Sequence, residues 1–276
     1  NGGDAAEPQF DDDGNPIAQV KKIVKRGRKD GRHAGAATLE SNVDALDLKV
    51  PRGCFYGFLG PNGAGKSTTI RMLTGLMAPT AGAATVLGED MATGGLAAKA
   101  RIGVVPEDLC LFDNLTAREY LIFIGRMYRV EKPVIAQRAG ELFALLGLED
   151  AEKTLVADFS HGMKKKLSLA AALIHDPELL FLDEPFEGID AITSRTIRGV
   201  LDRFVEREST IFLTSHILEI VEKLCTHVGI INQGRLVADG TLADFARGGS
   251  LEEAFVQAVG RVEQTPPTLS WLNGAR

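Results

Sequence analysis

The sequence is poor in cysteine and tryptophan, with three residues of the first kind and one of the second. Cys54, Cys110 and Cys225 are odd in number, far apart in the chain and without CxxC spacing. They therefore predict neither a disulfide framework nor a zinc site, and we expect them to be buried as small hydrophobic residues. Trp271 stands near the end of the sequence and is assigned no role.

The sequence also lacks an apolar run of the roughly 18 to 20 residues that a membrane-spanning helix needs. The richest segment, LSLAAALIHDPELLFLDEP, is interrupted by His175, Asp176, Pro177 and Glu178. The first residues are polar and acidic, unlike the charged and then apolar start of a secretory signal. These absences predict a cytoplasmic protein.

A surplus of positive charge is absent as well, since the formal net charge is −6 and the pI is near 5.5. A general nucleic-acid binder neutralises phosphates with a basic surface, which this balance does not supply. One segment is an exception, and its basic residues are Lys21, Lys22, Lys25, Arg26, Arg28, Lys29 and Arg32. We interpret it as a solvated strand and turn, with attraction to acidic lipid head groups as the alternative.

What the sequence does contain is 45% hydrophobic residues in 276, enough to bury a substantial core. Residues 1–18 hold glycines and prolines among acidic residues, a composition that predicts a disordered acidic tail. We expect a single folded unit over residues 19–260, with no internal repeat, and a C-terminal tail over residues 261–276.

Short apolar runs of the buried-strand type recur along the chain as CFYGFL, LLFLDEP and TIFLTSH. Helical patterns separate them, which predicts a mostly parallel sheet. The run VGIINQGRLVADG predicts a closing hairpin that turns at Gln233 and Gly234. Residues 108–165 predict a mainly helical lobe, in which a T-x-x-E capping box at Thr116 opens one helix and Pro133 begins another.

The segment GPNGAGKST follows the first of these apolar runs and satisfies the pattern G-x-x-x-x-G-K-[ST]. Backbone N–H groups of such a loop surround phosphate oxygens, and the next helix directs its positive end at the same anion. We expect Lys66 to meet the charge of the β- and γ-phosphates and Ser67 to offer its hydroxyl to magnesium. The segment therefore predicts a site for a nucleoside triphosphate.

Two acidic residues end the apolar run LLFLDEP. Asp183 stands where a carboxylate can hold the shell of a magnesium ion, and Glu184 stands where a second one can orient or deprotonate water. His216 follows the next apolar run, from which a neighbouring strand could bring it to the γ-phosphate. Together with the glycine loop, these residues favour phosphate chemistry.

In this order, the segments GPNGAGKST, FSHGM, LLFLDEP, the turn at residues 188–190 and TSH resemble the ATP-binding subunit of an ABC transporter. The resemblance covers about residues 40 to 245, and the spacings between its motifs fit. It implies an α/β P-loop NTPase core with a mostly parallel sheet, an N-terminal antiparallel β subdomain and an inserted helical lobe. It also implies two MgATP sites that form only when two cassettes face each other head to tail.

The site residues that the resemblance implies fall into five groups. ATP would be bound by Gly60, Asn62, Gly63, Ala64, Gly65, Lys66, Ser67 and Thr68. The catalytic residues would be Lys66, Glu184 and His216, and the magnesium ligands Ser67, Glu107 and Asp183. The signature segment, which acts on the nucleotide of the partner cassette, would be Ser160, His161, Gly162 and Met163. Asp190 would lie in the turn that crosses the dimer interface.

The sequence departs from the family pattern at three places. The signature is usually L-S-G-G-Q, and here His161 replaces a glycine and Met163 the glutamine, so that we expect a weakened or retuned contact with phosphate. The family's hinge glutamine is replaced by Glu107, which offers oxygen to magnesium but adds negative charge; we interpret it as a tolerated variant. No aromatic residue occurs between Phe10 and Phe55 to stack on adenine; His33 could substitute, and the stacking residue stays unassigned.

The leading interpretation is the ATP-driven motor of a membrane exporter, and the segment SLEEAFVQAVG resembles the end of cassettes in such exporters. It implies a second cassette and a separate integral membrane permease as partners, no direct nucleic acid, and a place at the inner face of the cell membrane. One alternative is a soluble ABC ATPase that acts on DNA or ribosomes, which the single cassette and the short interval from Glu107 to Ser160 disfavour. Another is a regulatory cassette of a heterodimer, which the presence of Glu184 disfavours. The substrate and the choice between homodimer and heterodimer stay open.

Overall fold

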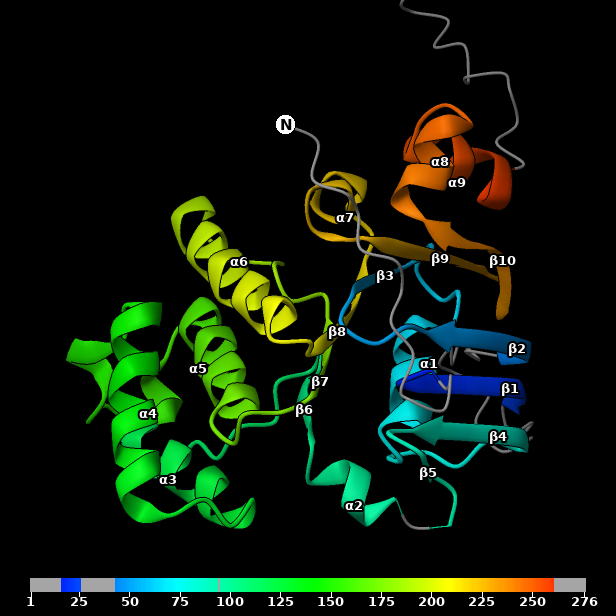
Figure 1. Ribbon diagram of the computed structural model, residues 1–276. Coiled ribbons are helices and arrows are strands. Elements are labelled where there is room, and N and C mark those ends of the chain that lie inside the picture. Colours follow the sequence, from blue (N-terminus) through cyan, green and yellow to red (C-terminus); the bar gives the residue numbers. More distant parts are fainter. Residues whose placement is uncertain (1–15, 26–42, 94, 261–276) are drawn as a thin grey trace, which may run out of the picture.

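The computed structural model describes residues 16–25, 43–93 and 95–260, which form two sheets and the helices around them (Figure 1). Most of the expected acidic tail, most of the basic segment, His33 and the expected C-terminal tail lie outside the described residues.

A six-stranded sheet in the order β10-β9-β3-β8-β7-β6 forms the centre of the described structure. Its strands are β3 (Phe55–Leu59), β6 (Ile102–Val105), β7 (Leu179–Asp183), β8 (Thr210–Ser215), β9 (His227–Asn232) and β10 (Arg235–Thr241). All neighbouring pairs are parallel except β9 and β10, which confirms the expected mostly parallel sheet. The hairpin between these two strands turns at Gln233 and Gly234, which both have positive φ, as a tight hairpin turn requires.

A second, antiparallel sheet has the order β2-β1-β4-β5, with β1 (Ala18–Lys25), β2 (Val43–Val50), β4 (Ala81–Val86) and β5 (Glu89–Asp90). It confirms the predicted N-terminal antiparallel subdomain. The expectation that the acidic tail extends to residue 18 is wrong. Ile17 is buried, and Ala18 is buried and pairs with Val50 and Val86, because these apolar residues belong to the sheet.

Alternate residues of the central strands enter two separate hydrophobic clusters. Leu180 and Leu182 belong to the cluster that includes the helical lobe, whereas Leu179 and Phe181 belong to the cluster of the antiparallel sheet. This period of two is the one that a strand covered on both faces must have. Helix α1 (Lys66–Leu73) lies on the side of the antiparallel sheet (Figure 1).

The helical lobe lies on the other side of the central sheet (Figure 1). It consists of α3 (Ala117–Met127), α4 (Lys132–Leu146), two short 3-10 helices, η1 (Glu149–Ala151) and η2 (Val156–Asp158), and the start of α5 (His161–Leu173). The predicted capping box at Thr116 is confirmed, and Pro133 lies in the first turn of α4. The expected limit of the lobe at residue 165 falls inside α5, which continues to pack against the sheet.

The remaining helices are α2 (Leu96–Lys99), α6 (Ala191–Glu206), α7 (Leu218–Leu224), α8 (Leu242–Arg247) and α9 (Leu251–Val259). Within the described ranges, no helix combines the length and the apolar character needed to cross a membrane. The cysteine prediction holds for Cys54 and Cys225, which are buried, and is wrong for Cys110, which is exposed. Cys110 stands in the irregular segment after β6, outside the sheets that bury the other two.

Candidate functional site

The glycine loop connects β3, whose residues are all buried, to the first turn of α1. Gly63 and Gly65 have φ values of 79° and 110°, a region that side chains with a Cβ rarely adopt. At Gly60 a Cβ would lie 2.4 Å from the carbonyl oxygen of Ile231, so that only glycine allows the loop to approach β9. The Gly234 N–H donates to the Ala64 carbonyl at 2.9 Å and ties the loop to the hairpin.

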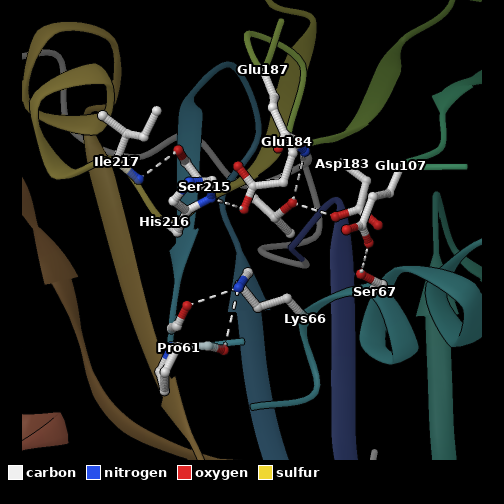
Figure 2. Close-up of polar contacts among 12 residues, drawn as sticks. Pro61, Lys66, Ser67, Glu107, Asp183, Glu184, Glu187, Ser215, His216 and Ile217 are labelled. Atoms are coloured by element: carbon white, nitrogen blue, oxygen red, sulfur yellow. Dashed lines mark hydrogen bonds and ion pairs between the residues drawn. The ribbon is translucent and has the colours of Figure 1, made fainter. Parts of the chain in front are cut away.

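Lys66 is buried at the start of α1, and its ammonium group turns back onto the loop. Its Nζ donates to the carbonyl oxygen of Gly60 at 2.8 Å and to that of Pro61 at 3.4 Å (Figure 2). A buried ammonium group needs such acceptors. The loop therefore holds a positive charge beside its N–H groups.

Asp183 and Glu184 stand at the end of β7, and both are buried. Thr214 holds the two residues together: its hydroxyl donates to Asp183 Oδ1 and accepts from the Glu184 N–H at 3.1 Å. The parallel register of β7 and β8 pairs Asp183 with Thr214, which explains this contact. Sequence reasoning missed Thr214, although its place in TIFLTSH at the end of a neighbouring strand is a usable signal.

Glu184 has a left-handed backbone with a φ of 48°, which is unusual for a residue with a Cβ and directs the chain away from the strand. Its Oε1 lies 3.0 Å from Nδ1 of His216, which follows β8 (Figure 2). The side chain of His216 is 46% exposed and that of Glu184 8%, so that the imidazole is the group of the pair that reaches solvent. The structure thus brings together the two predicted catalytic groups of adjacent strands.

Ser67 and Glu107 come together from α1 and from the segment after β6 (Figure 2). The Ser67 hydroxyl donates to Glu107 Oε2 at 3.1 Å. With Asp183, these groups present the hard oxygen donors that magnesium prefers, in a shell that phosphate and water oxygens would complete. No dense cluster of three or more acidic, histidine or cysteine ligands occurs among the described residues.

A cavity of about 180 Å³ joins these elements. Its lining residues are Asn62, Gly63, Gly65, Lys66, Ser67, Thr68, Arg71, Glu107, Asp183 and Glu184. Arg71 was missed by sequence reasoning, although it follows Ser67 by one helical turn and so lies on the same face of α1. A larger cavity of about 450 Å³, between α4 and α6, contains none of the predicted site residues.

The signature segment does not line the cavity of about 180 Å³ at the glycine loop. Ser160 is exposed and caps α5, since its hydroxyl accepts from the Met163 N–H at 3.3 Å. Asp190 caps α6 in the same way, and its hydrogen bonds from Thr193 hold the pKa of its carboxyl below the usual value. Within one chain the structure therefore separates these groups from the glycine loop.

Comparison with known proteins identifies this arrangement. The profile of the family described as ABC transporter matches residues 43–187, which is more than half of the chain. The chain belongs to the ABC transporter family. The resemblance inferred from the motifs is thereby confirmed.

Three relatives within the ABC transporter family illustrate the similarity. The linearmycin resistance ATP-binding protein LnrL of Bacillus subtilis is 41% identical over 73% of this chain and 65% of its own length. The bacitracin transport ATP-binding protein BcrA of Bacillus licheniformis is 43% identical over 72% and 65%. The daunorubicin/doxorubicin resistance ATP-binding protein DrrA of Streptomyces peucetius is 39% identical over 73% and 61%. The chain thus matches less than two thirds of the length of each relative.

Solved ABC structures share the fold. The ATP-binding subunit of an ABC transporter matches with a TM-score of 0.78 at 30% identity, over 88% of this chain and 99% of the other. A dimeric ATP-binding cassette in a post-hydrolysis state, bound to ADP and Pi, matches with a TM-score of 0.72 at 20% identity, over 82% and 98%. At that identity the second likeness shows the fold alone. The predicted P-loop NTPase fold is confirmed.

Proposed function

We propose that the chain binds MgATP in the cavity at the glycine loop and hydrolyses it to drive transport through a separate membrane permease. The observation that supports this most is the convergence of Lys66, Ser67, Asp183 and Glu184 on one cavity at the ends of parallel strands. Ligands of open α/β sheets bind at this edge.

The loop and α1 would hold the triphosphate. The loop N–H groups and the positive end of the helix attract its oxygens, and Lys66 exchanges its carbonyl acceptors at Gly60 and Pro61 for the β- and γ-phosphates. Ser67, Glu107 and Asp183 would hold magnesium, which supplies neutralisation of the charge that develops during phosphoryl transfer. Arg71, which also lines the cavity, adds a positive charge at its rim.

Glu184 would orient and deprotonate the attacking water. Its side chain lines the cavity, and only its backbone N–H, not its carboxylate, bonds the Thr214 hydroxyl. His216 contacts the same carboxylate at 3.0 Å and would meet the γ-phosphate from the exposed side. Asp183 is held by the Thr214 hydroxyl and so keeps a fixed orientation toward the metal. The two acidic residues thus have separate tasks.

A second cassette would complete each site. Ser160 and His161 are exposed at the start of α5, where helix N–H groups bind anions, and neither lines the cavity at the glycine loop of the same chain. We propose that they contact the nucleotide of a facing cassette, with Gly162 and Met163, and that Asp190 lies at that interface. The likeness to a dimeric cassette supports a fold compatible with this arrangement.

A membrane permease would dock on the helical lobe. The lobe exposes the large apolar side chains of Phe112, Phe123 and Met127, and the rings of Phe112 and Phe123 pack edge to face. Exposed apolar side chains that gather in this way mark interaction surfaces. We propose export, from the cytoplasmic face, because the relatives described above are named for linearmycin resistance and bacitracin transport. A further relative of 41% identity, from Cupriavidus metallidurans, is named Nod factor export ATP-binding protein I.

Hydrolysis of MgATP by the Lys66→Ala variant tests this function. We expect the purified chain to bind and hydrolyse MgATP, and the variant to lose at least about 100-fold in hydrolysis because the buried cation is removed. Lys99→Ala is the matched control, since its Nζ also donates to a glycine carbonyl, that of Gly75 at 3.2 Å, but outside the cavity. Equal hydrolysis by Lys66→Ala and the parent would contradict the proposal. Copurification with a membrane protein tests the permease.

A further inference from the structure

Lys165 is buried in the second turn of α5, with 2% of its surface exposed. Three consecutive lysines, Lys164, Lys165 and Lys166, follow the signature segment. Their environments in fact differ, because Lys164 reaches outward to the exposed Asp113 at 2.8 Å whereas Lys165 points inward. A lysine is almost never fully buried unless it is paired, so that the partner of Lys165 indicates its role.

That partner is the segment that follows the two site carboxylates. Lys165 Nζ donates to the backbone carbonyl of Glu187 at 3.0 Å. Burial lowers the pKa of Lys165, while Glu187, Glu184, Glu107 and Asp183 act on it in the opposite direction. The ammonium group therefore stands in the field of the acidic residues of the nucleotide cavity without lining that cavity.

The segment of residues 184–190 is anchored at its start, where the Glu184 N–H donates to the Thr214 hydroxyl at 3.1 Å and Phe186 is buried. Its internal backbone bonds are long, with Glu187 N to Glu184 O at 3.3 Å and Ile189 N to Phe186 O at 3.4 Å. The segment begins with the left-handed Glu184 and ends where Asp190 caps α6. The bond from Lys165 is shorter than both internal bonds and comes from a different element.

The start of α5 meets the same segment at a second point. A Cβ at Gly188 would lie 3.4 Å from Cδ2 of His161, and a Cβ at Gly162 would lie 3.4 Å from the carbonyl oxygen of Gly188. The signature segment and residues 184–190 therefore lie beside each other, with room for about a methyl group at these two glycines.

We propose that Lys165 is a positioning residue that fastens residues 184–190 to the signature helix, and so links Glu184 of one nucleotide site to the segment that serves the facing site. The proposal rests on the proposed function. Lys165 does not line the nucleotide cavity. It acts through the carbonyl of Glu187, three residues from the carboxylate that activates water.

The test is the effect of Lys165→Met, which keeps the length of the buried side chain but removes the donor, on kcat and KM. We expect kcat to fall about tenfold and KM for ATP to change by less than about twofold, since the glycine loop is intact. Lys165→Arg, which keeps a donor, should restore most of kcat. Lys164→Met is the matched control and should hydrolyse ATP like the parent.

Hydrogen exchange gives a readout that does not depend on catalysis. In nucleotide-free protein, Lys165→Met should increase exchange of the amides of residues 184–190, and Lys164→Met should not. If Lys165→Met does not fold, Lys165→Gln keeps polarity without the reach and should show the same increase and the same loss of kcat. Unchanged exchange and kcat in the folded variant, or a loss confined to KM, overturns the role of Lys165. Absence of hydrolysis by the parent chain would instead contradict the proposed function.

Discussion

Two helices of the chain, α1 and α5, begin with small residues, and they differ in the polar groups that surround their first turns. The glycine loop before α1 lies over a cavity of about 180 Å³ that contains a buried lysine and two buried carboxylates. The signature segment before α5 has an exposed Ser160 and lines no part of that cavity. Both can attract an anion, but only the first has the groups around it that chemistry needs.

The difference teaches how much of a nucleotide site one chain can prepare alone. At the glycine loop the polar groups are fixed by the fold: Lys66 by two carbonyls, Asp183 by Thr214 and Glu184 by His216. At the signature segment Ser160 is occupied with capping its own helix. Preorganised groups stabilise a transition state because they need no rearrangement. The first region is therefore expected to govern chemistry and the second to govern when chemistry occurs.

The largest effect should follow from Glu184→Gln in the cavity at the glycine loop. The amide keeps the size of the side chain and cannot accept a proton from water, so that we expect hydrolysis to fall about 10²- to 10⁴-fold. ATP binding should persist, because the loop and Lys66 are unchanged. Phosphate release measures the first quantity and equilibrium binding of labelled ATP the second.

Glu187→Gln is the control for that variant, since this exposed glutamate stands three residues later and does not line the cavity. It contributes its backbone carbonyl to Lys165, which the substitution leaves in place. We expect hydrolysis close to that of the parent. Turnover by Glu184→Gln at the rate of the parent would remove Glu184 from its proposed role.

A smaller effect should follow from Ser160→Glu in the exposed signature segment. The acidic side chain repels the phosphates of a facing nucleotide, so that hydrolysis should fall about tenfold or more while ATP binding by the same chain stays within about twofold. Ser250→Glu is the matched control, because Ser250 also caps a helix, α9, by accepting from the N–H of the third residue. An equal loss of ATP affinity and of hydrolysis in Ser160→Glu would refute action on the partner's nucleotide.

The sequence predicts the cavity at the glycine loop well because its motifs are local. The loop from Gly60 to Ser67 carries its own conformation in its glycines, and the strand that ends at Asp183 is recognisable as a buried apolar run. The same holds for the helix starts at Thr116 and at Pro133, which depend on residues of the first turn. Local chemistry fixes these features without knowledge of the tertiary structure.

What the sequence does not predict depends on partners far along the chain. Thr214 matters through the register of β7 with β8, which no spacing reveals. Lys165 stands in a run of three lysines, and only the packing of α5 decides that the middle one is buried. Cys110 is exposed for a similar reason, because its segment lies outside both sheets. Tertiary contacts determine the hydrogen bonding of Thr214 and the burial or exposure of Lys165 and Cys110, and residue type alone does not predict them.

The smallest effect, and the sharpest test of the comparison, is expected from His161→Gly. His161 is the first residue of α5 and is exposed, and its ring lies beside Gly188. Glycine allows close approach of a backbone to a ligand, so that we expect kcat to rise about two- to threefold with unchanged ATP affinity. The cost in stability should be below about 1 kcal/mol, because glycine at a helix end costs less than in its interior.

His161→Ala is the variant that separates the two explanations of such a gain. Alanine removes the imidazole but keeps a Cβ, so that a gain from backbone approach should be small in His161→Ala and full in His161→Gly. A loss of kcat in both variants would show that the imidazole itself contacts the partner's phosphate. The signature segment would then supply a specific chemical group to the phosphate, as the glycine loop does with Lys66. The proposed difference between the two helix starts would be contradicted.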